Sequence, residues 1–281
     1  MSRRRLIGLG IAAGLGVTAL ATSACSPDAP WLPGPPGATR ERPACVPRSA
    51  LPRFDRLAGL PLIYEVTRRR SEFAIESGFA HQLEAWLADL VRLTGWAAEQ
   101  LRTYGAWTKG GETSGAQTSG AGACSSWHNA GRAFDLARIR LADGTDVSCR
   151  YDLWRAHSGS ELVRSRRVYW SVAASAHKHF AYVLTYLYNA EHHNHIHLDN
   201  GRSGASWSTF SSRSVAQVQA VQGICRHLWN SRDEPSGCWD SSTQESVGRV
   251  LADLDLGNDL ADPAAWHGFL DASARRGAEP A

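Results

Sequence analysis

The chain has 281 residues, of which 43% are hydrophobic and 20% are charged, and a composition of this kind excludes a disordered protein. Its length suits one medium domain with a smaller one, or two modest domains. The formal net charge is +3, an amount that Arg3, Arg4 and Arg5 alone supply. A neutral remainder argues against sequence-independent nucleic-acid binding, which needs a basic surface, and we expect no nucleic-acid partner.

Residues 1–25 have the three parts of an export signal. Arg3 to Arg5 precede an apolar run from Leu6 to Leu20, and small residues lead to Cys25. The run is short and rich in glycine, so a transmembrane anchor is the weaker alternative. The beginning resembles a twin-arginine signal, and Ser23-Ala24-Cys25 resembles the end of a bacterial lipobox. We therefore expect export to the periplasm or cell envelope, with Cys25 lipidated and anchoring the chain to the membrane.

Residues 26–44 form a proline-rich segment that we expect to act as a semi-rigid linker, so that the folded part begins near Cys45. The chain has six cysteines and no C-x-x-C pair, which disfavours a zinc site built from cysteines. Cys225 and Cys238 lie close in sequence and are the best candidates for a disulfide. Spacing leaves the pairing among Cys45, Cys124 and Cys149 open.

The elements predicted between residues 45 and 204 alternate between strands and helices. In chain order we predict a strand over 61–66, an amphipathic helix over 81–95, a long loop over 108–124, a strand over 133–141 with a short partner ending at Cys149, a buried helix over 170–188 and a strand over 193–199. This order predicts an α+β domain with a small antiparallel sheet, flanking helices and a metal site, followed by a small helical module.

Two segments carry the residues suited to metal chemistry. The first runs from Ser126 to Asp135 and the second from Tyr188 to Asp199, where four of the eleven histidines fall within six positions. Alternate residues of a strand share a face, so His193, His195, His197 and Asp199 are predicted to point one way. His128, Asp135 and one or two of these histidines can then supply the three protein ligands of a catalytic zinc site. The plainer alternative is a solvated or adventitious histidine cluster.

The two segments together resemble a known group of enzymes. Ser126-x-His128-x-x-Gly131-x-Ala133-x-Asp135 followed by His195-x-His197 is similar to the pattern of the LAS-type zinc metallopeptidases, the group with the lysostaphin, D-Ala-D-Ala metallopeptidase and hedgehog fold. The whole tail, with Tyr188-Asn189, His192, His195, His197 and Asp199, most resembles the extensin-like C-terminal domain family. The resemblance implies that His128, Asp135 and His197 bind Zn²⁺ and that His195 is the catalytic residue beside the metal, where it supports or replaces the general base.

Two departures from the pattern affect this assignment. Asn194 stands where the related enzymes have an acid, and an amide cannot accept a proton, so the base is His195 or, as weaker alternatives, Glu191 or His192. A clear arginine-bearing turn for a substrate carboxylate is also missing. Arg102 is the nearest candidate, and it joins Ser126 as a predicted substrate-binding residue.

Residues 212–258 are predicted to form a separate helical module. A helix begins near Val218 and a second opens at Thr243, and the segment resembles a small peptidoglycan-binding domain without its turn glycine. A generic helical hairpin is the equal alternative. Residues 259–281 are rich in Ala and Gly, and we predict a disordered tail.

The function expected from these residues is an exported zinc peptidase acting on peptidoglycan. Two rivals stay open: a catalytically weak cell-wall-binding protein with a structural metal site, which Asn194 motivates, and a periplasmic metal-binding protein using His192, His193, His195 and His197.

Overall fold

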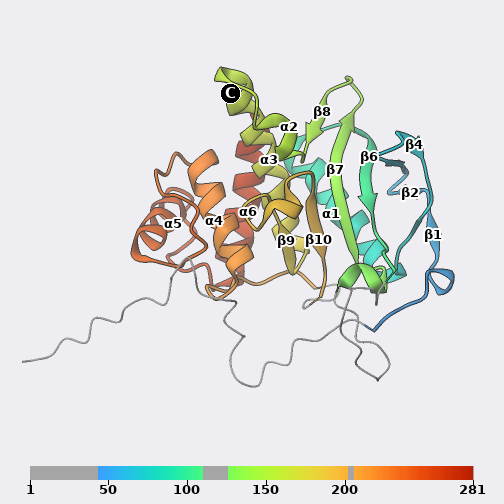
Figure 1. The fold of residues 1–281 in the computed structure, drawn as a ribbon. Helices are drawn as coiled ribbons and strands as arrows, with labels where there is room; N and C mark the ends of the chain where they lie inside the picture. Colours follow the sequence, from blue (N-terminus) through green and yellow to red (C-terminus); the bar gives the residue numbers. More distant parts are fainter. Residues whose placement is uncertain (1–43, 110–125, 202–205, 281) are drawn as a thin grey trace, which may run out of the picture. The chain divides into compact units, whose positions relative to one another are not determined.

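The structure is a computed structural model, and it describes residues 44–109, 126–201 and 206–280. These residues form an α+β fold with two sheets (Figure 1). The strands are β1 (Arg53–Phe54), β2 (Arg56–Leu57), β3 (Leu60–Tyr64), β4 (Arg69–Arg70), β5 (Phe73–Ala74), β6 (Ala98–Gly105), β7 (Ala133–Leu141), β8 (Asp146–Ser148), β9 (Tyr182–Leu184) and β10 (Ile196–Asp199). The helices are α1 (Ser77–Thr94), α2 (Tyr151–Trp154), α3 (Gly159–His179), α4 (Val215–Leu228), α5 (Ser241–Asp253) and α6 (Pro263–Ala278), with short 3-10 turns η1 (Arg48–Ala50), η2 (Trp127–Ala130) and η3 (Ala190–His192).

The larger sheet has the strand order β2-β3-β6-β7-β10-β9, with β4 beside β3 and β8 beside β7. The pair β3 and β6 is parallel, because α1 crosses over between them, and the other pairs are antiparallel. The second sheet is the short antiparallel pair of β1 and β5. The predicted strands over 61–66 and 133–141 are confirmed as β3 and β7, and the predicted helix over 81–95 as α1.

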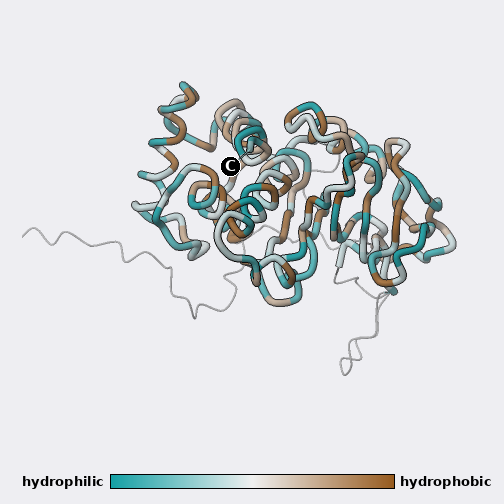
Figure 2. The backbone as a smooth tube through the Cα atoms, turned by 90° about the horizontal axis from the view of Figure 1, so that it is seen from above, coloured by the Kyte–Doolittle hydropathy of each residue, from teal (hydrophilic) through white to brown (hydrophobic). Residues whose placement is uncertain are grey.

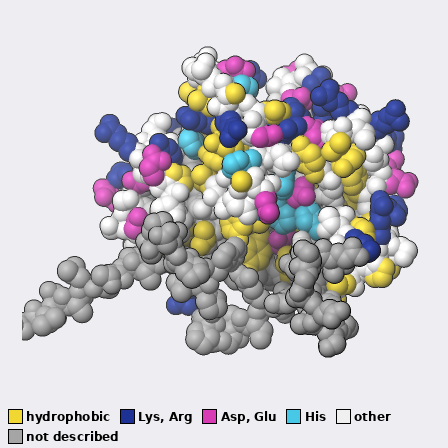
Figure 3. Space-filling view, viewed as in Figure 1, with side chains coloured by type: hydrophobic (Ala, Val, Ile, Leu, Met, Phe, Trp, Pro, Cys, Tyr) yellow, Lys and Arg dark blue, Asp and Glu magenta, His cyan; other side chains and the backbone are white. Residues whose placement is uncertain are grey.

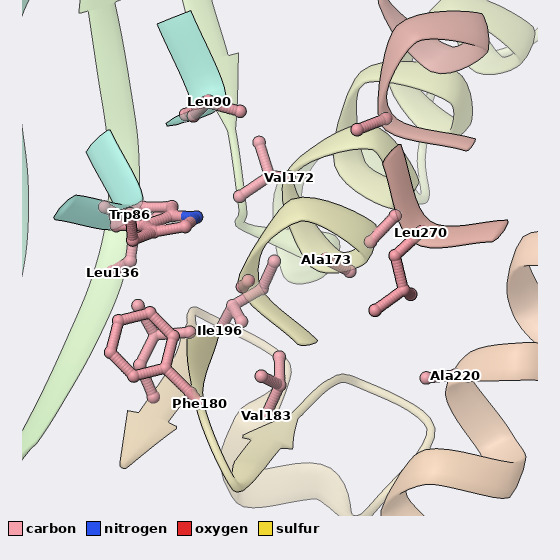
Figure 4. Close-up of a cluster of buried hydrophobic side chains, with 14 of the residues drawn as sticks. Trp86, Leu90, Leu136, Val172, Ala173, Phe180, Val183, Ile196, Ala220 and Leu270 are labelled. Carbon is pink, nitrogen blue, oxygen red and sulfur yellow. The ribbon is translucent and has the colours of Figure 1, made fainter. Parts of the chain in front are cut away.

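One face of the larger sheet packs against α1 and α3. Trp86 of α1, Leu136 of β7, Ile196 of β10 and Phe180, which follows α3, meet in this core (Figure 4). On α3, Val172 lies toward Leu90 of α1, and Ala173 lies toward Leu270 of α6. Hydrophobic and hydrophilic residues alternate along the strands and helices, because each has one face toward this core (Figure 2). None of the described helices is long and apolar enough to cross a membrane.

Two predictions about the second half of the chain are wrong. The helix predicted over 170–188 runs from Gly159 to His179, and the chain then enters β9. The tail predicted to be disordered forms α6, which packs on α3. Trp266, Phe269 and Leu270 of α6 are fully buried, and they join α4 and α5 to the same hydrophobic core as the sheet. Residues 212–258 therefore share the core of the sheet domain instead of building a separate one.

The predicted disulfide between Cys225 and Cys238 is also wrong. Cys225 is a free, buried thiol on α4, as is Cys149, whereas Cys45 and Cys238 are each disulfide-bonded. Cys25 and Cys124, the export signal, most of the proline-rich segment and most of the predicted loop over 108–124 lie outside the described residues.

A buried histidine on α3 makes the stability of this fold pH-dependent. His177 is fully buried against Trp266, and within the described chain neither of its ring nitrogens has a hydrogen-bond partner. Burial lowers its pKa to about 3. In the unfolded chain the same group takes up a proton below about pH 6.5, so the unfolding free energy declines as pH falls from 6.5 toward 3.

We expect His177→Leu to remove this dependence. The wild type should lose about 2 kcal/mol of unfolding free energy between pH 7 and pH 5 through His177, and the variant should lack that loss. Urea unfolding at the two pH values, followed by circular dichroism, measures the difference. His81→Leu, at an exposed position of α1, is the control and should behave as wild type. Parallel pH dependences of the His177 variant and the wild type would contradict the expectation.

Candidate metal centre

The turn before β7 places His128 at the end of the sheet. Ser126 caps η2, where its hydroxyl accepts from the backbone N–H of His128 at 3.3 Å, while the side chain of Asn129 accepts from the Ser126 N–H at 3.2 Å. Gly131 ends the turn with a left-handed φ of 68°, and a Cβ there would come within 2.6 Å of Leu51. A glycine is therefore required at this position for the chain to turn from His128 into β7.

The register of β7 and β10 brings the next two residues together. Asp135 lies directly opposite His197, while the neighbouring Ile196 and Leu198 are buried in the core. Opposed residues of adjacent strands point to the same face of a sheet, so Asp135 and His197 face away from the helices. Figure 3 shows histidine side chains gathered on this face, with acidic side chains beside them.

Three side-chain atoms converge at this place. His128 Nε2 lies 3.1 Å from Asp135 Oδ1 and 3.2 Å from His197 Nδ1, and the last two atoms are 3.0 Å apart. Four ligands bound tetrahedrally at 2.0–2.1 Å would be about 3.3 Å from one another. The three donor atoms thus have the spacing and the chemistry of zinc ligands, and the predicted ligand set His128, Asp135 and His197 fits a single ion.

The electrostatics of the cluster favour a bound positive charge. Burial opposes ionisation of Asp135, but the charge of His128 and hydrogen bonds from His128, His195 and His197 hold the pKa of this carboxyl well below its usual range. Burial likewise lowers the pKa of His197, yet hydrogen bonds to Asp135 and Asp199 outweigh it and raise the pKa to about 10. The carboxylates therefore retain a cation in the cluster, and a metal ion can take the place of that proton.

Asp199 orients His197 from behind. Its Oδ2 accepts a hydrogen bond from His197 Nε2 at 3.0 Å, and its Oδ1 accepts from the backbone N–H of Gly201 at 2.9 Å. When a metal ion displaces the proton on Nδ1, the hydrogen that remains on Nε2 donates to Asp199, and the lone pair of Nδ1 is directed toward Asp135 and His128. Strand alternation predicts Asp199 on the face of the histidines, without a role of its own in the site. The His-x-Asp spacing at the end of the strand was the available signal for this contact.

We expect Asp199→Asn to weaken zinc binding by about 10- to 100-fold without removing a ligand. The amide keeps the shape of the side chain but loses the charge that stabilises the imidazole in its metal-binding orientation. Competition with a fluorescent zinc chelator measures the change. Asp271→Asn, on α6, removes a carboxylate outside the cluster and is the control. An unchanged zinc affinity in Asp199→Asn would contradict a supporting role for this carboxylate.

His195 lies beside the three ligands with a defined tautomer. Its Nδ1 is 2.6 Å from Asn194 Oδ1, and an amide oxygen can only accept, so Nδ1 carries the hydrogen. The other ring nitrogen, Nε2, faces the cluster at 3.2 Å from Asp135 Oδ1. With the hydrogen on Nδ1, the charged form of His195 donates from Nε2 to Asp135, and the neutral form presents the lone pair of Nε2 to the site. The Asn194 side chain cannot accept a proton itself, but its amide oxygen orients the ring of His195, which can.

His192 is the fifth member of the group. Its Nδ1 lies 2.6 Å from Asn189 Oδ1, and its ring centre is 5.2 Å from that of His195. Burial, followed by the charges of His197 and His195, lowers its pKa to about 3. His192, His195 and His197 form a second set of possible metal donors. These residues line an open cavity of about 380 Å³ together with Trp127, Leu184 and Glu191.

Of three further residues that the sequence predicts for the site, only Ser126 lines the cavity. His193 does not share the face of His195, because β10 begins only at Ile196 and the ring of His193 packs against Tyr151 at 5.1 Å. Ser126 both caps η2 and lines the cavity. Arg102 lies on β6 opposite Arg138, outside the residues that line the cavity.

The cavity also has a structural support that the sequence analysis missed. Arg132 donates from Nε to Asn200 Oδ1 at 2.8 Å, and its guanidinium lies 4.6 Å from the ring of Trp127. Asn200 in turn donates to Gln82 of α1 at 2.8 Å. This chain of polar contacts ties the wall of the cavity to the helix behind the sheet, and no local spacing in the sequence indicates it.

Comparison with known families gives one match. The model of the family described as Extensin-like protein C-terminus matches residues 60–209, which include all five residues of the histidine and aspartate group. A search of curated proteins and a search of solved structures found no match to the chain.

Proposed function

The chain belongs to the extensin-like protein C-terminus family, and from this membership and its candidate metal centre we propose that it is an exported zinc-dependent peptidase acting on peptidoglycan. The observation that carries the proposal is the convergence of His128 Nε2, Asp135 Oδ1 and His197 Nδ1 within 3.2 Å at the wall of an open cavity. Structural zinc sites close around four protein ligands, whereas catalytic sites use three and leave one position open. Three ligands beside a cavity support the catalytic kind.

Each residue of the group has a task in peptide hydrolysis. Zinc, when bound by His128, Asp135 and His197, supplies Lewis-acid activation of water and of a peptide carbonyl. His195 accepts a proton at Nε2, and Asn194 holds it in the tautomer that can do so. His192 lies beside both His195 and His197, with its ring centre 5.2 Å and 5.8 Å from theirs, and its low pKa keeps its ring neutral there.

The walls of the cavity support a peptide substrate. Trp127 and Leu184 give it apolar surface, and the exposed Glu191 gives it a negative group at the rim. The predicted export signal and lipid anchor at Cys25 would hold this site at the cell envelope, where peptidoglycan is the abundant polymer with accessible peptide bonds.

Incubation of purified sacculi with the full chain tests the proposal. The wild type should release new muropeptides, detected by mass spectrometry, and should lose this activity to a chelator and regain it with one equivalent of zinc. His128→Ala should bind no zinc tightly and release nothing. Failure of the zinc-loaded wild type to cleave any muropeptide bond would overturn the peptidase proposal.

A cell-wall-binding protein with a structural metal is the second candidate, favoured by one residue. Asn194 replaces the acid of the related enzymes and cannot serve as a base. This candidate predicts that the wild type sediments with sacculi and holds one zinc ion, without releasing muropeptides. The sacculus experiment therefore separates the two functions in one measurement.

A further inference from the structure

A β-bulge places arginines on the same face of the sheet as the metal centre. Arg102 of β6 lies opposite Arg138 of β7, but the next residue, Thr103, lies opposite Leu136, so Ala137 is an extra residue in β7. The bulge reverses the alternation of the strand. Phe134, Leu136, Ile139 and Leu141 all face the core, whereas Asp135, Arg138 and Arg140 share the opposite face.

Three carboxylates form ion pairs with three arginines of this region. Glu65, whose side chain is 5% exposed, accepts from Arg138 Nε at 2.9 Å and from Arg150 Nη1 at 3.2 Å. Asp152 holds Arg150 at 2.6 Å, and Asp146 holds Arg140 at 3.1 Å. The side chains of these three arginines remain 17–35% exposed, and their guanidinium groups keep N–H groups that these carboxylates do not use.

Arg102 gives the group its surplus charge. It is half-buried, and it forms no ion pair with any carboxylate of the described residues. Its neighbour across the strands is the positively charged Arg138, an arrangement that costs stability in the absence of an anion. Its other neighbour is the amide of Gln100, whose oxygen can accept from Arg102 Nε at 3.1 Å.

The arginines adjoin the catalytic histidine through one aromatic ring. The ring of Tyr104 lies 6.1 Å from that of His195 on one side and 6.0 Å from the guanidinium carbon of Arg150 on the other. An extended peptide advances about 3.3 Å per residue, so a substrate at the metal centre reaches the arginines within a few residues.

We propose that Arg102, Arg138, Arg140 and Arg150, here called the arginine track, bind a free carboxylate of the substrate a few residues from the scissile bond. The enzyme then selects acidic peptides, such as wall stem peptides with unamidated carboxylates, over neutral ones. Guanidinium groups bind carboxylates through charge-assisted hydrogen bonds in a fixed planar geometry. This proposal rests on the proposed peptidase function for the position of the scissile bond.

Arg102→Gln tests the track because it removes the surplus charge without breaking an ion pair. We compare purified muropeptides with the same muropeptides after amidation of their carboxylates. The variant should raise the KM for the acidic substrates about tenfold, with kcat unchanged, and should leave the amidated substrates unaffected. Arg53→Gln, an exposed arginine of β1 in the other sheet, makes the same charge change and should behave as wild type.

A measurement of equilibrium binding tests the arginine track independently of peptidase activity. The Kd of the full chain for acidic and amidated muropeptides, measured by calorimetry, needs no turnover. The wild type could cleave nothing and still bind acidic muropeptides more tightly than amidated ones, with this preference lost in Arg102→Gln. That result would overturn the peptidase function and support carboxylate binding by the arginine track. Equal losses for acidic and amidated ligands in Arg102→Gln, or no loss for either, would overturn the track.

Discussion

His195→Ala should lower kcat for muropeptide release by about 10²- to 10⁴-fold while the protein still binds one zinc ion. The three proposed ligand atoms belong to His128, Asp135 and His197, so their geometry does not need the His195 ring. What the variant loses is the lone pair that Nε2 presents to the site. Zinc content by mass spectrometry of metals, measured beside kcat and KM, separates the two effects.

Asn194→Ala is a companion variant with a smaller expected effect. Without the amide oxygen of Asn194, the hydrogen of a neutral His195 is no longer held on Nδ1 and can move to Nε2. Activity should therefore fall, but less than in His195→Ala, and zinc should stay bound. If His195→Ala keeps full activity, His195 is not the base, and His192 becomes the residue to replace. If it loses zinc, His195 is itself a ligand, as the second donor group of the site would allow.

Trp266→Ala should reduce the unfolding free energy by about 3–5 kcal/mol. Trp266 is fully buried on α6, its indole N–H donates to Ser208 at 2.9 Å, and its ring packs against Phe210 and Phe269. The substitution leaves a large cavity, and the buried hydroxyl of Ser208 loses the indole N–H as its hydrogen-bond donor. Urea unfolding of the oxidised protein, followed by far-ultraviolet circular dichroism, measures the loss.

The chain offers a matched control one position from Ser208. Trp207 is 57% exposed and packs over the buried Lys178 and beside His267, so Trp207→Ala removes little buried area and should cost about 1 kcal/mol. Small, equal losses in the two variants would mean that residues 263–278 do not pack on the domain, as the sequence analysis expected.

The strands and helices that the sequence predicts correctly are those in which apolar residues recur at a regular spacing. The strand over 133–141 matches β7, and the helix around Leu83, Trp86 and Leu90 matches α1, because alternation and helical spacing of apolar residues appear directly in the sequence. The pattern failed where packing sets the boundary. The apolar residues after His179 look helical, but the chain leaves α3 there and adds β9 beside β10. Helix α6 was missed because Ala- and Gly-rich sequence hides three large buried side chains.

The sequence by itself determined the charge distribution, the two histidine segments and the identity of His128, Asp135, His195 and His197 as the residues suited to a metal. The +3 charge is accounted for by the first arginines and says nothing about the fold. Residue types and short spacings are local properties, and chemistry that depends on them is visible without a structure.

Only the tertiary structure decided how these residues meet and what surrounds them. The register of β7 against β10 sets Asp135 opposite His197, and a single extra residue at Ala137 turns Arg138 and Arg140 toward the same face. Strand register and bulges follow from the balance of packing over the whole sheet, since a shift of one residue would move every side chain to the other face. The support of His197 by Asp199, the burial of α6 and the arginine track all follow from that balance.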